Sequence, residues 1–282
     1  YWIPLRAVNS AGSDGPWATT LFYLVPLVLL LPIAVIRWRQ IINAGWPLQW
    51  IAIPAALARG LYSNAFLYTD VIRAILLYYL TPIWSALLAR AWLKAPITRS
   101  RVVAIGLGIL GLFVILNADQ GMPIPKNGGD WMALISGLFW ALAANIMRRE
   151  SAQNTFDVLV TWFFWAVVFG LILALLPILD RPKIPEVGQI IVILPWFIPV
   201  VLFLIIPGFY AIAWGVPLLN PGTVGILFMT EISVGAISAA LLTNEPFGMR
   251  ELLGVALITG AGLTEAFTAV FYSCLLYTSP SP

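Results

Sequence analysis

Long apolar runs, separated by short polar segments, follow one another along this chain. A run of about 18 or more apolar residues is long enough to cross a bilayer as a helix. These runs predict nine complete spanning helices, near residues 17–36, 46–68, 71–93, 102–118, 130–147, 156–179, 188–215, 221–243 and 250–272. The opening segment, YWIPLRAVNSAG, is too short to span, yet it ends in a Gly/Ser turn like those between the later runs. We therefore expect an all-α integral membrane protein with ten helices, the first of them truncated.

Two of these runs echo each other about 150 residues apart, ILLYYLTPIWSALLARAWLKAP at 75–96 and GILFMTEISVGAISAALLTNEP at 225–246. An offset of five spans makes the two copies cross the membrane in opposite directions. Inverted repeats of this kind are typical of secondary transporters. We therefore predict two inverted five-helix halves, residues 1–120 and 128–273, joined by a polar Gly/Pro-rich segment.

The last residues, 274–282, are expected to be a disordered tail that is not native, because the sequence becomes rich in Ser and Pro after Tyr272. The single cysteine, Cys274, lies in this tail, so the chain offers no disulfide framework.

Composition agrees with a membrane protein and excludes several classes of function. The chain is 61% hydrophobic and 10% charged, against roughly 25% charged residues in soluble domains. It has no histidine, which argues against imidazole metal sites and histidine-based acid–base catalysis. No activated serine, paired carboxylates or phosphate-cradling GxxxxGK[ST] loop is present. We therefore expect no enzyme activity, no metal site and no cofactor.

Basic residues concentrate in alternate loops, which predicts the orientation. Arg37 and Arg39 lie after the first complete span, and Arg148 and Arg149 lie four spans later. Cytoplasmic loops carry an excess of Lys and Arg, so these loops, and with them both ends of a ten-helix chain, are predicted to be cytoplasmic. The net charge of +3 is ordinary for such a protein and does not indicate nucleic-acid binding.

Four charged residues lie inside or near the apolar runs: Arg6, Arg59, Glu231 and Glu265. A charge at mid-depth costs at least about 2.5 to 3.5 kcal/mol on insertion scales, so each should face protein or water. Glu231 is the most informative of the four, because it lies in the second echo segment. It is either a site for a substrate amine or a proton, or a structural ion pair with Arg59 or Arg6, and both interpretations stay open.

Aromatic and helix-breaking residues inside the spans form a second group of candidates. Membrane proteins use most Trp and Tyr as interfacial anchors, but an aromatic wall with a few polar groups also suits a small amphipathic solute. Proline inside a span frees a carbonyl and kinks the helix, which a hinge or cavity can use. The candidates for binding are Tyr78, Tyr79, Trp140, Tyr210 and Trp214 with the polar Asn145, and those for hinges are Pro82, Pro207 and Gly208.

Three segments resemble a known family: DVIRAILLYYLTPIWSALLARAWLKAPITRSRVVAIGLGILGLFVIL (70–116), TVGILFMTEISVGAISAALLTNEPFGMRELLGVALITGAG (223–262) and the opening YWIPLRAV. They are similar to the drug/metabolite transporter superfamily, to its EamA-type proteins, and within these most of all to the YddG-type aromatic amino acid exporters. The resemblance implies ten helices in two inverted repeats around a central cavity. Carried onto this chain, it places the residues Arg6, Arg59, Tyr78, Tyr79, Pro82, Trp140, Tyr210, Trp214 and Glu231 on cavity-lining helices.

These observations together predict a secondary transporter of the bacterial inner membrane. It would move small amphipathic metabolites, with amino acids, including aromatic ones, as the leading class, by rocking its halves in alternating access. A membrane-embedded receptor or scaffold, or a channel, is the alternative. The expected partners are a small-molecule substrate and the lipid bilayer but no nucleic acid, and a homodimer is an assembly that the sequence allows.

Overall fold

The computed structural model describes residues 1–81, 84, 87–88, 99–115, 125–176, 183–218, 231, 234–235, 238–239, 241–242 and 248–278; within helices, the side chains of 100, 101, 112, 115 and 265–278 are not described. All the regular structure in these ranges is helical. Pro82 and most of the predicted span 221–243 lie outside them.

Five helical stretches in the described ranges are long and apolar enough to cross a membrane. They are α2 (Pro16–Ile36), α3 (Trp38–Tyr68), α7 (Gly128–Arg149), α8 (Thr155–Leu175), and the rod formed by α9 (Val187–Val200), η2 (Val201–Ile205) and α10 (Ile206–Leu218). Each of them contains or largely overlaps a run predicted from the sequence. The structure also describes α1 (Trp2–Ser10), α4 (Val71–Tyr78), α6 (Arg99–Ile115) and α12 (Met249–Thr278).

The last helix is longer than the sequence predicted. We expected it to end near Tyr272, but α12 continues to Thr278. The segment SCLLYT contains four hydrophobic residues and no helix breaker. The first proline after it is Pro280, and a proline disfavours the helical conformation of the residue before it.

The described helices pack into two compact units. Unit 1 comprises Tyr1–Tyr68 and Leu142–Leu218, and unit 2 comprises Thr69–Ala141 and Leu219–Pro282. Each unit therefore takes residues from both sides of the boundary that we predicted between two halves of the chain. The two predicted halves are continuous segments of sequence whose helices cross the membrane in opposite directions, which is a different division from these spatial units. It stays a prediction.

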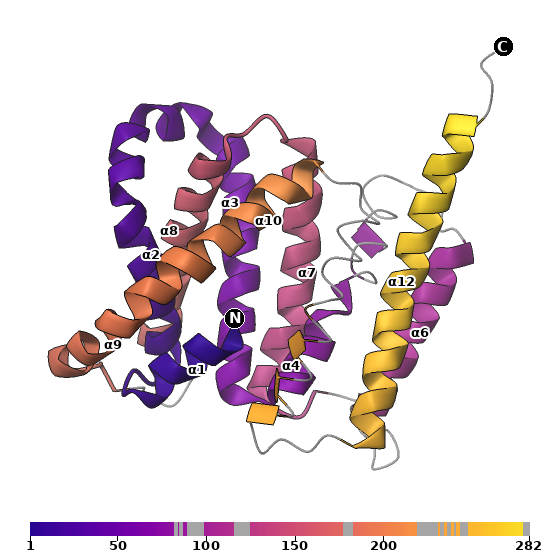
Figure 1. Cartoon of the computed structure of the whole chain (residues 1–282), viewed down its shortest axis with the longest axis horizontal. Helices are drawn as coiled ribbons and strands as arrows, with labels where there is room; N and C mark the ends of the chain where they lie inside the picture. The colour runs from indigo at the N-terminus through magenta and orange to yellow at the C-terminus, as the bar shows by residue number, and fades with distance from the viewer. Residues whose placement is uncertain are drawn as a thin grey trace. The chain divides into compact units, whose positions relative to one another are not determined.

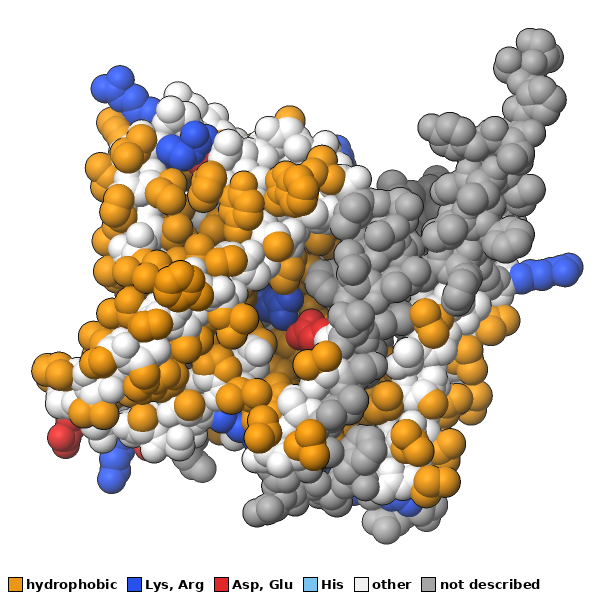
Figure 2. Space-filling model, viewed as in Figure 1, with side chains coloured by type: hydrophobic (Ala, Val, Ile, Leu, Met, Phe, Trp, Pro, Cys, Tyr) orange, Lys and Arg blue, Asp and Glu red, His pale blue; other side chains and the backbone are white. Residues whose placement is uncertain are grey.

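Helix α8 lies at the centre of unit 1, where it packs against both α2 and α3. In Figure 1 the salmon α8 lies among the indigo and purple helices α2 and α3, with the orange α10 beside them. Gly170 of α8 lies so close to α2 that an added Cβ would be 2.6 Å from the Thr20 hydroxyl oxygen. On the other side, the Trp165 indole N–H donates to the Gln49 side-chain oxygen over 2.7 Å. Figure 2 shows hydrophobic side chains over much of the visible surface of α9 and α10, as expected of helices that face lipid.

Two helices of unit 1 depart from regular geometry. Helix α3 is kinked at Gly45, whose φ of 61° and ψ of −146° suit glycine alone. The kink lies directly before residue 46, where the sequence predicted the span to begin. In the other helix, η2 lies between Pro199 and Pro207, and the Ile206 N–H bonds to the Val201 carbonyl. Pro207 has no N–H for the Phe203 carbonyl, which explains why the regular α-helical bonding is interrupted here.

An aspartate in the first turn of α8 holds the end of α2. Asp157 accepts hydrogen bonds from Arg37, from Nε over 2.6 Å and from Nη2 over 2.9 Å. This paired, bidentate geometry is the strongest that arginine forms with a carboxylate. It raises the pKa of Arg37 above its usual value, mainly through the hydrogen bond from its guanidinium, so Arg37 stays charged at any physiological pH.

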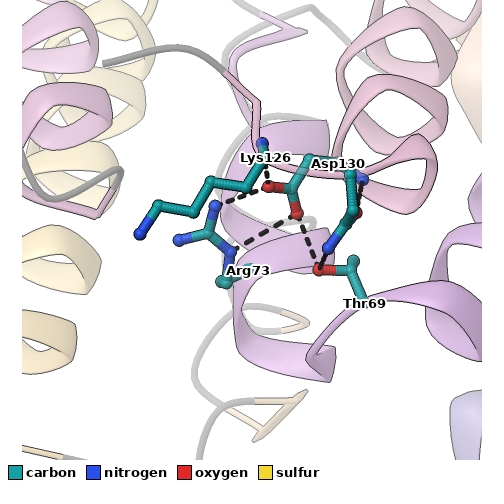
Figure 3. Close-up of polar contacts among 5 residues, drawn as sticks. Thr69, Arg73, Lys126 and Asp130 are labelled. Atoms are coloured by element: carbon teal, nitrogen blue, oxygen red, sulfur yellow. Dashed lines mark hydrogen bonds and ion pairs between the residues drawn. The ribbon is translucent and has the colours of Figure 1, made fainter. Parts of the chain in front are cut away.

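A second aspartate occupies the same position in α7, within unit 2 (Figure 3). The fully buried Asp130 forms a 2.5 Å ion pair with the Arg73 guanidinium. It also accepts from the Thr69 hydroxyl over 2.6 Å and from the Lys126 backbone N–H over 3.0 Å. Its own backbone N–H donates to the Asn127 side chain. Asp130 therefore ties the start of α4 to the start of α7, and its negative charge favours the N-terminal end of the α7 dipole.

The contact between Gly170 and Thr20 predicts that Gly170→Ala destabilises unit 1. Overpacking a dense interior costs about 1–3 kcal/mol, so thermal unfolding in detergent should begin at a lower temperature than in the unchanged protein. Gly60→Ala is the matched control, because Gly60 is also buried and helical in unit 1 but an added Cβ would meet nothing within 4 Å. Equal melting temperatures for the two variants would contradict this packing.

Removing the charge of Asp130 should destabilise unit 2 more strongly. Breaking one partner of a buried ion pair costs about 3–5 kcal/mol, because the other charge is left uncompensated. We expect Asp130→Asn to lower the melting temperature in detergent, measured by far-UV circular dichroism. Asp14→Asn should leave it unchanged, because Asp14 is an exposed residue just before α2. A fully stable Asp130→Asn protein would show that the cluster does not secure these helices.

Candidate functional site

Glu231 makes a defined polar contact within unit 2. The Tyr79 hydroxyl donates a hydrogen bond of 2.8 Å to Glu231 Oε2. Tyr79 lies at the C-terminal end of α4, where its backbone N–H bonds to the Ile75 carbonyl, and its side chain is buried. The ring of Tyr78 packs edge-on against it, with the centroids 5.2 Å apart. The half-exposed carboxylate of Glu231 thus has an aromatic, hydrogen-bonding neighbour.

Trp140 lies on α7, which packs against the C-terminal end of α4. An added Cβ at Gly137 of α7 would be 2.6 Å from the Tyr78 carbonyl oxygen and 3.3 Å from the Thr81 hydroxyl. Trp140 follows Gly137 by three positions, so both lie on one face of α7, and Trp140 is buried. Of the predicted site residues, Tyr78, Tyr79, Trp140 and Glu231 therefore belong to one unit and to packed elements of it.

Arg59 is enclosed by aromatic rings within unit 1. Its side chain is 3% exposed, and its guanidinium carbon lies 5.7 Å from the Tyr1 ring, 5.9 Å from Tyr62 and 5.7 Å from Phe209. These distances are within the range of cation–π attraction, which strengthens in a site without water. Three ring faces thus stabilise a positive charge on a spanning helix.

A chain of hydroxyl groups runs beside Arg59. The Tyr23 hydroxyl bonds to the Ser63 hydroxyl over 2.6 Å and donates to the Arg59 carbonyl over 3.0 Å. The Tyr1 hydroxyl bonds to both Tyr23 and Ser63. Nearby, the Arg6 Nε donates to the Phe66 carbonyl over 3.0 Å, so α1 is also held to α3. This part of unit 1 combines positive charge, hydroxyl groups and aromatic surface in one packed cluster.

The remaining predicted residues are spread over unit 1. The half-buried Tyr210 packs its ring against Phe156, with centroids 4.9 Å apart, and Asn145 is half-buried. Trp214 is 57% exposed. Pro207 and Gly208 are exposed at the start of α10, directly after the π-helical segment. Pro82 lies outside the described residues.

The predicted ion pair between Glu231 and an arginine stays a prediction. Glu231 belongs to unit 2, whereas Arg59 and Arg6 belong to unit 1. In the part of the chain that the structure describes, no group of three or more acidic or thiol side chains is arranged to hold a metal ion.

Sequence reasoning missed the partners that surround these residues. Tyr62 and Ser63 lie three and four positions after Arg59, and Phe66 lies four and three positions after them, so their shared helix face was visible in the sequence. The rings from other helices had no such signal. The burial of Asp130 also had no signal in the sequence, because nothing local links it to an arginine 57 positions earlier.

A solved structure described as "Crystal structure of protein" has the same fold. Its TM-score with this chain is 0.63 at 15% sequence identity, and the match covers 96% of this chain and 94% of that one. At this level of identity the likeness concerns the fold alone.

Sequence comparison indicates the family. This chain is 25% identical over 265 residues to the protein named "Uncharacterized transporter sll1319" from Synechocystis sp. (strain ATCC 27184 / PCC 6803 / Kazusa), covering 85% of this chain and 75% of that protein. The model of the EamA-like transporter family matches twice, over residues 6–117 and 127–264. These two matches cover most of the chain, and the protein belongs to the EamA-like transporter family of the drug/metabolite transporter superfamily.

Proposed function

We propose that this protein is a secondary transporter of the bacterial inner membrane that moves small amphipathic metabolites, with amino acids as the leading class. Membership of a transporter family and the long apolar helices support membrane transport in general. The relative from a cyanobacterium is consistent with a bacterial membrane. In this proposal the protein catalyses no chemical reaction.

The hydrogen bond between Tyr79 and Glu231 is the observation that carries the proposal. A carboxylate within an apolar span is costly, so its presence marks a functional group by default. Glu231 is partly exposed, and among the described residues its Oε2 accepts a hydrogen bond from the Tyr79 hydroxyl. A carboxylate held in this way can accept the ammonium group of an amino acid or carry a proton.

Contacts between the two echo segments support an arrangement in inverted repeats. Ile75 lies against Gly235, and Tyr79 bonds to Glu231. The first residue of each pair belongs to the segment 75–96 and the second to the segment 225–246. Equivalent helices of inverted repeats often meet near the substrate site of a transporter. In the proposal, ten helices form two inverted halves, and alternating access uses the Pro- and Gly-containing helices as hinges.

The irregular end of α9 offers such a hinge. The π-helical segment η2 and Pro207 interrupt the regular bonding where α10 begins. Irregular turns of this kind cluster at functional positions in helices. A helix that has already lost regular hydrogen bonds bends there at lower cost than elsewhere.

Replacing the carboxylate should abolish most of the transport. We expect Glu231→Gln to reach the membrane and to lower uptake of labelled amino acids into proteoliposomes about tenfold or more, since bonds to a charged group are worth about 1.5–3 kcal/mol. Tyr79→Phe removes one neutral donor and should lower uptake less. Glu150→Gln is the control, because Glu150 pairs only loosely with the exposed Arg149, at 3.7 Å. A fully active Glu231→Gln protein would exclude the carboxylate from the site.

Trp140 should affect bulky substrates more than small ones. Stacking between aromatic rings adds about 0.5–1.5 kcal/mol, so Trp140→Leu should lower the ratio of tryptophan to alanine transport several-fold. This ratio does not depend on the amount of folded protein. Trp131→Leu on the same helix is the control, because Trp131 is exposed at the start of α7. An unchanged ratio in Trp140→Leu would remove Trp140 from the substrate site.

A further inference from the structure

Helix α3 is too long for the membrane that its neighbour crosses. At 1.5 Å per residue, the 21 residues of α2 measure about 31 Å, close to the roughly 30 Å of hydrocarbon in a bilayer. The 31 residues of α3 measure about 46 Å. Because α2 already ends at Ile36 and a single residue, Arg37, separates it from α3, the chain reaches the membrane surface at this point.

The kink at Gly45 divides α3 into two parts with different tasks. The part from Trp46 to Tyr68 measures about 34 Å and crosses the membrane by itself. The short helix Trp38–Ala44 lies between two segments that each cross the bilayer, so it does not itself cross the hydrocarbon core. In Figure 1 it passes between the upper ends of α2 and of the spanning part of α3.

This short helix is amphipathic at helical spacing. Trp38, Ile41 and Ile42 share one face, and Arg39, Gln40 and Asn43 share the opposite face. The apolar side is not covered by the unit, since Trp38 is 53% and Ile42 65% exposed. Tryptophan and isoleucine on one side and polar residues on the other are typical of helices that lie in a membrane interface.

Neighbouring side chains continue the apolar face and add positive charge. Trp46 and Trp50 are exposed, and their rings lie 6.4 Å apart, in the place of an interfacial aromatic belt. The Arg39 guanidinium lies 5.4 Å from the Trp38 ring and is exposed to solvent. Arg37 is already committed to Asp157. Basic side chains accordingly appear at the upper left of unit 1 in Figure 2.

We infer that Trp38–Ala44 is an interfacial helix that lies along the bilayer surface, with Trp38 and Ile42 among the upper acyl chains and Arg39 on an anionic lipid phosphate. The occupant of its exposed apolar face is the headgroup boundary of the membrane. The bidentate bond between Arg37, directly before this helix, and Asp157 fixes the helix to the start of α8. The contact of the helix with lipid therefore determines how deeply unit 1 lies in the bilayer.

Site-directed spin labelling tests this placement in the whole protein. Cys274→Ser removes the native thiol, and single labels are placed at Gln40, Ile42 and Asn43, all without buried contacts to lose. In bilayers containing phosphatidylglycerol, power saturation should show the label at Ile42 accessible to oxygen and those at Gln40 and Asn43 accessible to a water-soluble nickel complex. If the depth of the label in the bilayer changes steadily from position 40 to 42 to 43, the segment crosses the membrane, and the inference is wrong. If all three labels are exposed to water, the segment does not contact the membrane, and the inference is also wrong.

The phosphate contact is tested separately with lipid composition. Phosphatidylglycerol should raise the melting temperature above that in phosphatidylcholine, and Arg39→Gln should lose most of this gain while Arg39→Lys keeps it. Arg149→Gln is the control, since Arg149 is also an exposed arginine of unit 1. If Arg39→Gln keeps the full gain, Arg39 does not bind a lipid phosphate.

Discussion

Polar groups within a bilayer must find their partners inside the protein, and the arrangement of this chain depends on that constraint. Water is absent from the hydrocarbon, so each unsatisfied polar group costs several kcal/mol. The Asp130 carboxylate accepts four hydrogen bonds from three residues, Thr69, Arg73 and Lys126. The charge of Arg59 lies against three aromatic rings. These contacts hold the helices around the two residues in place.

The same constraint distinguishes the two aspartates that hold helix ends from Glu231, the carboxylate for which we propose a role in transport. Asp130 and Asp157 lie in the first turns of α7 and α8, where each holds an arginine beside a helix end. Glu231 differs from both, because it is partly exposed and its described neighbour is the neutral hydroxyl of Tyr79. A carboxylate that is positioned but not neutralised by that neighbour is suited to a changing partner, such as a substrate amine or a proton.

The spans were predictable because length and apolarity determine them. The run at 17–36 became α2, and the predicted start at 46 coincides with the kink at Gly45. The sequence was less informative where residues distant along the chain, or the absence of a helix breaker, determine the structure. The burial of Asp130 depends on Arg73, far away in the sequence, and α12 passes Tyr272 because no proline follows before Pro280. Tyr62 shares a face of α3 with Arg59, but the other two rings, Tyr1 and Phe209, come from distant segments that no local pattern relates to Arg59.

Counterflow in proteoliposomes tests the central claim most directly. Vesicles that hold the protein are loaded with a high concentration of an unlabelled amino acid and diluted into a trace of the labelled one. An alternating-access transporter exchanges the two, so the account predicts a transient accumulation of label above its outside concentration, with saturable dependence on the internal amino acid. A channel gives only equilibration, and a receptor or scaffold gives no flux. Either of these results would contradict the account.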